Sequence, residues 1–241
     1  MATSLPRVRR SLNALPVAGF IDVETTGLNP ARDEVVEFAI ALFAFRPDSG
    51  EIMGIVGKYA GLRDPGRPIP KDASAIHGIR DADVRGKRLD ERRIRALLER
   101  AEFFVAHNAS FDRPFVERLF PEAGAKPWYC SMNGVPWKEL GFASRGLQNL
   151  LRDHGIRPQR AHRGLDDVEA ALLLLARTGS EGKQYFQYVL ERYGAPCGAT
   201  HRSGAAETPG LSATAAPGSG SGGRAARPLS SWLTRLLDRR E

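Results

Sequence analysis

The chain has 241 residues, of which 42% are hydrophobic, so it can bury one substantial core but is short for two domains. Its formal net charge of +7 is compatible with a polyanionic partner, although charge alone selects none. No run of eighteen apolar residues occurs, and the basic N-terminus lacks the apolar stretch and cleavage site of a secretion signal, so we expect a cytoplasmic protein without membrane contact.

The first predicted elements form a meander of three strands. Residues 19–24 are mostly apolar, and residues 35–45 and 51–60 are two further runs rich in β-branched and aromatic side chains. A Pro-Asp-Ser-Gly turn separates the second run from the third, which is typical of neighbouring antiparallel strands.

The elements after residue 70 alternate between helices and strands. Apolar periodicity predicts helices over residues 72–79, 89–102, 110–120, 145–154, 164–178 and 184–193, with strands at 103–108 and 128–131. Ser110 is the expected N-cap of the third helix, and Pro114 fits that helix only in or near its first turn. Gly155 and Gly179 are expected to end the helices that precede them. A hairpin followed by alternating helices and strands predicts an α/β domain with a mixed central sheet flanked by helices.

Composition divides the chain into four parts: an N-terminal extension (1–16), one domain (17–194), a flexible linker (195–228) and a short amphipathic segment (229–241). The linker is rich in Gly, Ala, Ser and Pro, so it cannot bury enough apolar surface to offset the entropy of ordering it. In the last segment Trp232, Leu233, Leu236 and Leu237 form one apolar stripe. Such a stripe on a tether favours docking on a partner protein over packing on its own domain.

Two acidic residues, Asp22 and Glu24, interrupt the apolar first strand. Residues two apart on a strand point to the same face, so their carboxylates lie side by side and repel each other unless a cation joins them. The alternative is an exposed edge strand whose acids face water, but the apolar flanking residues favour burial. Carboxylate oxygens suit hard cations such as Mg²⁺, and the distant cysteines Cys130 and Cys197 offer no thiolate site.

A metal site needs further ligands, and two later segments supply candidates. HNASFD places Asp112 at the start of a helix directly after a strand, the usual position of a functional group in α/β sheets. HRGLDD carries His162, Asp166 and Asp167 at the start of another helix. A helix turns by about 100° per residue, so His162 and Asp167 can flank one site only if His162 precedes the regular helix. This pattern alone leaves either Asp166 or Asp167 as the ligand.

Four segments in this order, FIDVETTGL, IHGI, HNASFD and HRGLDD, resemble the motifs of the DEDDh 3′-to-5′ exonucleases. This DnaQ-like superfamily includes the proofreading epsilon subunit of bacterial DNA polymerase III. The resemblance implies an RNase H-like fold and two Mg²⁺ or Mn²⁺ ions held by Asp22, Glu24, Asp112 and Asp167, with His162 as the general base. The family's five-residue interval after the histidine selects Asp167 over Asp166. Gly164 replaces an alanine common in the family, and we expect that change to leave activity intact.

The resemblance also implies contacts with the substrate. Ile76 and His77 would touch the terminal nucleotide, and Asn108 would lie near its phosphate. The backbone at Thr25 would meet the terminal 3′-hydroxyl, and Leu28 would wedge between the last two bases.

These features predict a metal-dependent 3′-to-5′ exonuclease that releases nucleoside 5′-monophosphates from the 3′ end of single-stranded DNA, in proofreading or repair. The first alternative is the same chemistry on short or structured RNA, because no residue settles recognition of the 2′-hydroxyl. The second is a non-catalytic nucleic-acid-binding module, against which the complete set of acids argues. The segment at 229–241 is expected to bind a DNA polymerase or another replication or repair protein.

Overall fold

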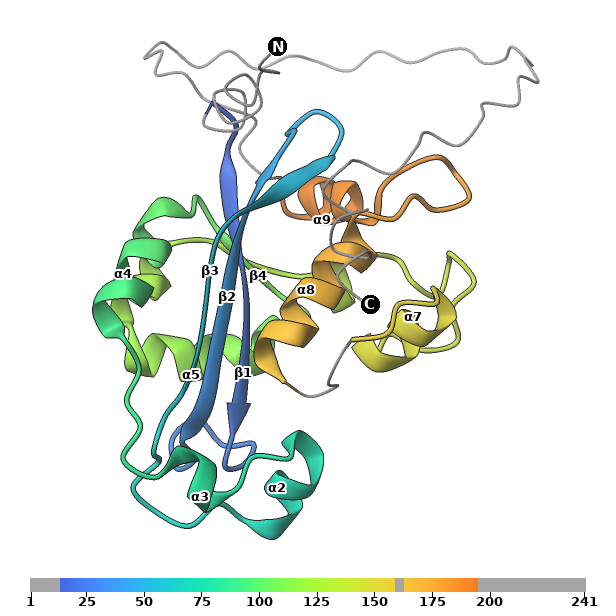
Figure 1. Cartoon of the computed structure of the whole chain (residues 1–241). Coiled ribbons are helices and arrows are strands. Elements are labelled where there is room, and N and C mark those ends of the chain that lie inside the picture. The colour runs from blue at the N-terminus through green and yellow to red at the C-terminus, as the bar shows by residue number, and fades with distance from the viewer. Residues whose placement is uncertain (1–13, 159–162, 195–241) are drawn as a thin grey trace, which may run out of the picture.

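The computed structural model describes residues 14–158 and 163–194. Its centre is a five-stranded sheet with the order β3-β2-β1-β4-β5 (Figure 1). The strands are β1 (Val17–Thr25), β2 (Val35–Phe45), β3 (Ile52–Leu62), β4 (Phe104–Ala106) and β5 (Trp128–Cys130). The first three are antiparallel neighbours, whereas β4 is parallel to β1 and β5 is parallel to β4. The predicted meander and mixed sheet are therefore confirmed.

Helices follow the meander and connect the later strands. They are α2 (Lys71–His77), α3 (Asp81–Val84), α4 (Glu91–Arg100), α5 (Ala109–Leu119), α6 (Ser131–Gly134), α7 (Leu147–Asp153), α8 (Gly164–Leu175), α9 (Tyr185–Tyr193) and the 3₁₀ helix η1 (Pro121–Ala125). Each predicted helix is present. The sequence did not indicate α3, α6 or η1, because a single turn is too short to show helical periodicity.

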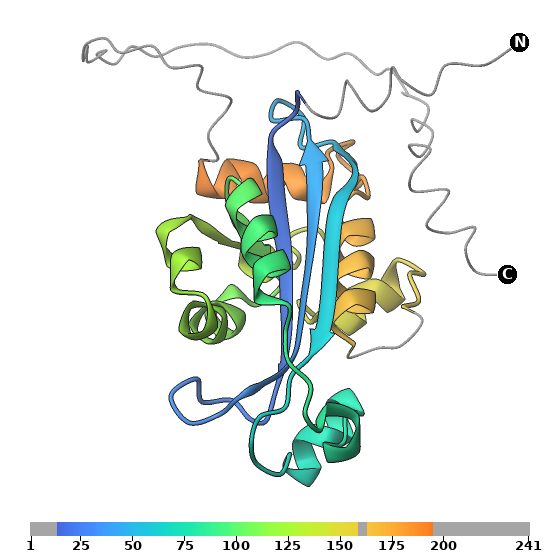
Figure 2. The same ribbon diagram turned by 60° about the vertical axis from the view of Figure 1, so that its left-hand side comes forward.

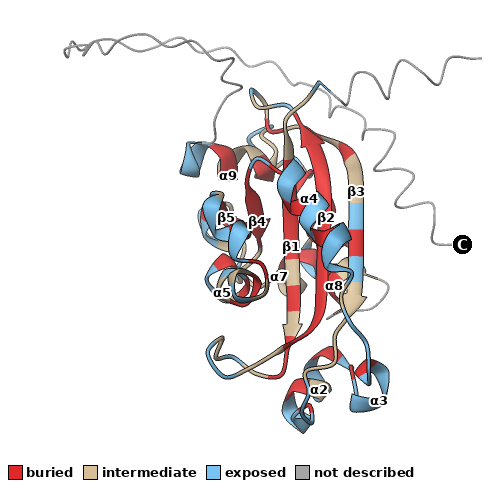
Figure 3. Ribbon diagram, turned by 90° about the vertical axis from the view of Figure 1, so that its left-hand side faces the viewer, coloured by how far each residue is buried: buried red, intermediate tan, exposed pale blue. Residues whose placement is uncertain are grey.

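Helices cover both faces of the sheet (Figure 2). On β1, Ala18 and Phe20 pack with α7, α8 and α9, whereas Ile21 and Val23 pack with α4 and α5 on the other face. All eleven residues of β2 are buried, as expected of a strand between two helical layers (Figure 3). This arrangement makes β1 and β2 the buried centre of the fold.

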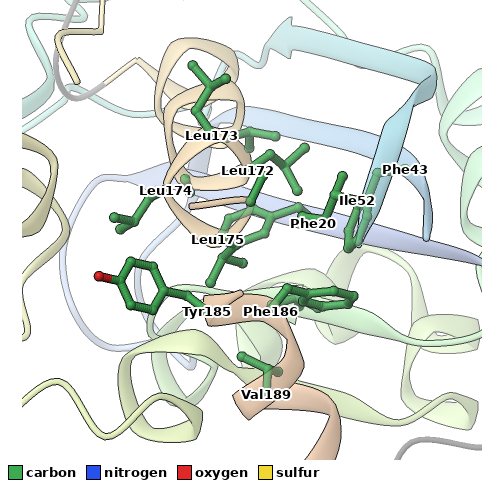
Figure 4. Close-up of a cluster of buried hydrophobic side chains, with 14 of the residues drawn as sticks. Phe20, Phe43, Ile52, Leu172, Leu173, Leu174, Leu175, Tyr185, Phe186 and Val189 are labelled. Carbon is green, nitrogen blue, oxygen red and sulfur yellow. The ribbon is translucent and has the colours of Figure 1, made fainter. Parts of the chain in front are cut away.

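The helix α8 is fixed by its apolar C-terminal half. Its leucines at positions 172–175 are all buried, and they lie with Phe20 and Phe43 in one cluster that also includes α9 (Figure 4). Phe186 of α9 meets the ring of Phe43 edge-on, with the ring centroids 5.1 Å apart. Because the cluster holds α8 against the sheet, the acidic first turn of α8 has a defined position relative to β1.

Some local expectations were confirmed and others were wrong. Gly155 has a φ of 65° directly after the C-cap of α7, as predicted. Asn108 rather than Ser110 is the N-cap of α5. Pro114 is the sixth residue of α5, beyond the first turn. Its missing N–H leaves the Ser110 carbonyl without a helical donor, and the exposure of Ser110 allows water to take that place. The helix α8 ends at Leu175, so Gly179 does not terminate it.

The N-terminal residues 1–13, the linker and the amphipathic C-terminal segment lie outside the described residues, so the predictions for them stay predictions. The proposed division of the chain into four parts is likewise untested. None of the described helices is long and apolar enough to cross a membrane.

Candidate active site

The predicted metal ligands meet where β1 and β4 end. These strands are parallel, so their carboxyl ends lie at the same edge of the sheet. Asp112, on the first turn of α5 directly after β4, accepts a hydrogen bond through Oδ1 from the backbone N–H of Val23, at 3.2 Å. The start of α8 lies against Asp22, because a Cβ atom added to Gly164 would be 3.6 Å from Asp22 Oδ2.

The acids of β1 do not lie on an exposed edge. β1 is hydrogen-bonded to β2 on one side and to β4 on the other, and Asp22 pairs with Ala39 of β2. The Oδ2 atom of Asp22 is buried and has no hydrogen-bond partner among the described residues. The edge-strand alternative is therefore wrong, and a buried carboxylate oxygen remains to be satisfied.

Burial and neighbouring acids raise the pKa values of the carboxylates on β1. Burial raises the pKa of Asp22 well above its usual value, and the nearby charges of Asp112, Glu24 and Asp167 raise it further. Burial, with Asp167 and Glu37, raises the pKa of Glu24 to about 8. Burial raises the pKa of Asp112 to about 7, against the effect of its backbone hydrogen bonds. A divalent cation among these groups would relieve the repulsion.

The acids lie near one another, but among the described residues their side chains are not arranged as a complete set of metal ligands. Among residues 14–158 and 163–194, no group of three or more His, Cys, Asp or Glu side chains is arranged as a ready-made metal cluster. Protein donors hold two of the carboxylates instead, since Asp167 Oδ1 accepts from Gln148 Nε2 at 2.9 Å and Asp112 is bound as above. The oxygen-only donor set and the unsatisfied Asp22 oxygen fit a hard divalent cation. The assignment of individual ligands stays a prediction.

His162 lies outside the described residues, but the chain beside it is informative. Arg163 is the N-cap of α8 with extended backbone angles, and the regular helix begins at Gly164. His162 thus precedes the helix, which is the condition for it to share a site with Asp167. Asp167 is buried and acts on the pKa values of Asp22 and Glu24. Asp166 is only half-buried and lines a pocket of about 280 Å³ with Arg163 and Leu165.

Two predicted substrate contacts are exposed apolar side chains. Leu28 is 82% exposed and Ile76 is 62% exposed, although most large apolar residues of the described chain are covered. Leu28 follows β1, and Ile76 is on α2, which lies beyond the carboxyl end of β1 (Figure 1). Both are therefore available to a ligand at this edge.

The remaining predicted contacts are less accessible. Thr25 is buried at the end of β1 and donates through Oγ1 to the carbonyl of Gly27, at 2.6 Å. His77 is buried, and its Nδ1 accepts from the backbone N–H of Ile79 at 3.0 Å. Asn108 caps α5 and so lies one turn before Asp112. Their substrate roles stay predictions.

Sequence reasoning missed two side chains that contact the site. Glu37 is the single charged residue in the otherwise apolar strand β2, and an isolated acid of this kind indicates a functional position. It is 5% exposed, and it forms an ion pair with Arg163. Gln148, the partner of Asp167, gave no signal, because a glutamine in the first turn of a helix is ordinary.

The fold, with the acids at the carboxyl edge of its central strand, is that of a nuclease of the RNase H-like class. Residues 20–175 match the family model described as Exonuclease, RNase_T. The chain belongs to this exonuclease family, within the DnaQ-like DEDDh superfamily.

Curated relatives are much longer than this chain. DNA polymerase III PolC-type from Thermotoga maritima is 31% identical over 162 residues, which are 65% of this chain and 11% of the relative. The PolC-type enzyme from Listeria monocytogenes is 28% identical over 171 residues, covering 68% of this chain and 11% of the relative. The match thus spans about a tenth of each of these relatives.

Solved structures show the same fold. Escherichia coli ExoI in a zinc-bound complex with single-stranded DNA has a TM-score of 0.55 at 19% identity, over 67% of this chain and 40% of ExoI. Exonuclease I from E. coli with a dA16 oligonucleotide has a TM-score of 0.54 at 21% identity, over 72% of this chain and 42% of that chain. At such identities the similarity shows the fold alone.

Proposed function

We propose that this chain is a metal-dependent 3′-to-5′ exonuclease that removes nucleoside 5′-monophosphates from the 3′ end of single-stranded DNA. The observation that carries the proposal is the convergence of Asp22, Glu24, Asp112 and Asp167 at the carboxyl edge of β1, with a buried Asp22 oxygen that no described donor satisfies. Membership of the exonuclease family supports the reaction. The fold shared with ExoI, which was solved with single-stranded DNA, supports the substrate.

The four carboxylates would hold two divalent cations, Mg²⁺ or Mn²⁺. Bound there, the cations supply positive charge to the entering and leaving oxygens of the scissile phosphate. An imidazole nitrogen of His162 accepts the proton of the attacking water, a task that suits a group with a pKa near 6.5. The exposed side chains of Leu28 and Ile76 contact the terminal bases, and apolar stacking of this kind tolerates any base.

The reaction is tested by digesting 3′-labelled single-stranded DNA, mismatched duplex DNA and RNA with Mg²⁺ or Mn²⁺. We expect labelled mononucleotide from single-stranded DNA, faster than from RNA. The double variant Asp22→Ala/Glu24→Ala should be inactive while its circular dichroism stays that of wild type. Full activity of that variant would refute the metal assignment, and faster digestion of RNA would assign the activity to RNA instead. His162→Ala should reduce turnover about 10²–10⁴-fold at neutral pH.

The physiological setting is a further part of the proposal. The curated relatives are PolC-type DNA polymerases, in which the matched region is a small part of the chain. This supports a cytoplasmic role beside a polymerase in proofreading or repair, with residues 229–241 as the docking segment. Deletion of 229–241 should spare digestion of free oligonucleotides and weaken co-purification with a replicative polymerase. Unchanged co-purification would dismiss the docking role.

A further inference from the structure

Glu37 is a buried acid beside the proposed metal site that nothing in the catalytic scheme uses. On the antiparallel register it lies directly opposite Glu24, one of the predicted ligands. Its side chain is 7% exposed, so its negative charge requires a partner. The described residues provide two contacts, both at the start of α8.

The first contact is a two-point ion pair with Arg163. Arg163 Nε lies 3.2 Å from Glu37 Oε2, and Arg163 Nη2 lies 3.2 Å from Glu37 Oε1. A guanidinium that meets a carboxylate through two nitrogens fixes direction as well as distance. The pair therefore fixes the residue immediately before α8 on the central strand β2.

The second contact is with the backbone of α8 itself. The N–H of Gly164 donates to Glu37 Oε2 at 3.1 Å. This N–H belongs to the first helical residue and has no partner within the helix. Gly164 also lies so close to β2 that an added Cβ would be 2.9 Å from the Cβ of Ala39. The start of α8 is thus held against β2 by an ion pair, by a hydrogen bond and by close packing of Gly164 on Ala39.

We propose that Glu37, through Arg163 and Gly164, is a positioning residue that sets the first turn of α8, and with it Asp167, beside the acids of β1. The chain links these parts directly, because the N–H of Asp167 donates to the Arg163 carbonyl at 3.0 Å. We refer to the three residues Glu37, Arg163 and Gly164 as the α8 anchor. The inference rests on the proposed function only in its use of the metal site.

A positioning role differs from a purely electrostatic one. Glu37→Ala alone would leave the positive charge of Arg163 unpaired near the acids, and that charge would itself repel a cation. Glu37→Ala/Arg163→Ala removes the anchor but keeps the summed charge of the pair at zero. Glu37→Gln/Arg163→Ala is also neutral, and it keeps an oxygen that can accept from the Gly164 N–H. The pocket of about 280 Å³ beside Glu37 and Arg163 allows water to hydrate truncated side chains, so these variants are expected to fold.

The test is calorimetric titration of each full-length variant with Mn²⁺, which needs no nuclease activity. We expect the dissociation constant of Glu37→Ala/Arg163→Ala to rise about 10–100-fold, the range for residues that orient metal ligands, and Glu37→Gln/Arg163→Ala to recover part of the loss. The matched control is Lys58→Gln/Glu169→Gln, which removes another ion pair between the sheet and α8, Lys58 to Glu169 at 2.5 Å, and also keeps the summed charge of the pair at zero. The control should bind Mn²⁺ as wild type does.

Each result decides the proposal. Wild-type affinity in Glu37→Ala/Arg163→Ala overturns it, and so does an equal loss in Lys58→Gln/Glu169→Gln, because any sheet–helix contact would then have the same effect. Wild-type protein that takes up no Mn²⁺ also overturns it. Weakened binding in the double variant, with a wild-type protein that digests no nucleic acid, would support the anchor and reject the proposed function. The two failures are therefore distinguishable.

Discussion

Glu24 on β1 lies directly opposite Glu37 on β2, so two carboxylates face each other across a strand pair at the centre of the fold. Like charges in directly opposed positions destabilise a sheet. Arg163 offsets one of them, and it lowers the pKa of Glu24 against the larger effects of burial and neighbouring acids. The metal-free protein is therefore expected to be less stable than a variant in which one of the repelling carboxylates is replaced by a neutral residue.

Asp22→Asn should stabilise the protein in the absence of metal. The substitution removes a buried carboxylate whose charge four neighbouring acids oppose, and the Oδ2 atom of that carboxylate has no described partner. We expect the free energy of unfolding in EDTA to rise by at least about 1.4 kcal/mol, the equivalent of one pKa unit, while Mn²⁺ stabilises wild type but no longer stabilises the variant. Urea unfolding with and without Mn²⁺ measures both effects.

The control for Asp22→Asn is Glu139→Gln, which also removes one negative charge but from an exposed position. It should change neither the stability in EDTA nor the response to Mn²⁺. If Asp22→Asn is less stable than wild type without metal, the carboxylate makes a favourable contact in the folded protein and repulsion among the acids is not the dominant effect.

Gln148→Ala should weaken metal binding with little effect on the fold. The Gln148 amide donates to Asp167 Oδ1 at 2.9 Å and is the described side chain that orients this carboxylate from α7. Residues that orient metal ligands typically change metal affinity about 10–100-fold when they are removed. The Mn²⁺ concentration for half-maximal digestion should rise accordingly, while the rate at saturating Mn²⁺ stays near that of wild type.

Asn149→Ala is the matched control for Gln148→Ala. Asn149 is the next residue of α7, and its amide donates to Ser144 Oγ instead of to the site. Its half-saturating Mn²⁺ concentration should equal that of wild type. A shift of the same size in both variants would mean that α7 acts through its general packing, and the specific role of Gln148 would be rejected.

The sequence predicted the strands, the long helices and the region where the acids meet, because strong periodicity and strand-end positions carry that information. It did not reveal Glu37 as part of the site, although an isolated acid in an apolar strand was visible. The contact between Glu37 and Arg163 joins residues 126 positions apart, and no local pattern encodes such a pair. The prediction of Ser110 as the cap is wrong for a related reason. Several polar residues lie near the start of α5, and the sequence does not show at which of them the helical backbone begins, which is directly after Asn108.

Gly164→Ala should reduce stability, although alanine is common at this position in the family. An added Cβ would be 2.9 Å from the Cβ of Ala39, which has no side-chain freedom to move away. Such overpacking costs about 1–3 kcal/mol, and relief by a shift of α8 would also move Asp167. We expect a lower free energy of unfolding together with a higher half-saturating Mn²⁺ concentration.

Gly146→Ala is the control for the glycine substitution. Gly146 also lies at a helix start, with a φ of −70° that suits any residue, and its added Cβ would make only ordinary contacts of 3.5 Å and longer. The free energy of unfolding of Gly146→Ala should not be lower than that of wild type. If Gly164→Ala has the stability and the half-saturating Mn²⁺ concentration of wild type, β2 and α8 can move apart at little cost. That result would argue against a tightly fixed helix start.

His107 should make the stability of the protein depend on pH just below neutrality. Its Nε2 lies 2.8 Å from the carbonyl of Arg145, so Nε2 carries the proton, and in the neutral ring Nδ1 accepts from Ser131 Oγ at 3.0 Å. Burial lowers the pKa of His107 in the folded protein, whereas the unfolded chain keeps a value near 6.5. As pH falls below about 6.5, the unfolded state binds more protons, so the free energy of unfolding decreases until the folded pKa is passed.

The acids of the site titrate in the opposite sense, so the contribution of His107 is isolated by comparison with His107→Gln. Wild type and variant are unfolded in urea at pH 7.5, 6.5 and 5.5, in EDTA. The difference between their unfolding free energies should be largest at pH 7.5 and shrink towards pH 5.5, because only wild type has a neutral imidazole to protonate. Because His107 lies directly before the cap of the helix that carries Asp112, the same comparison repeated with Mn²⁺ should retain this trend at a higher overall stability. A difference that is constant across the three pH values would mean that His107 keeps its ordinary pKa in the folded protein.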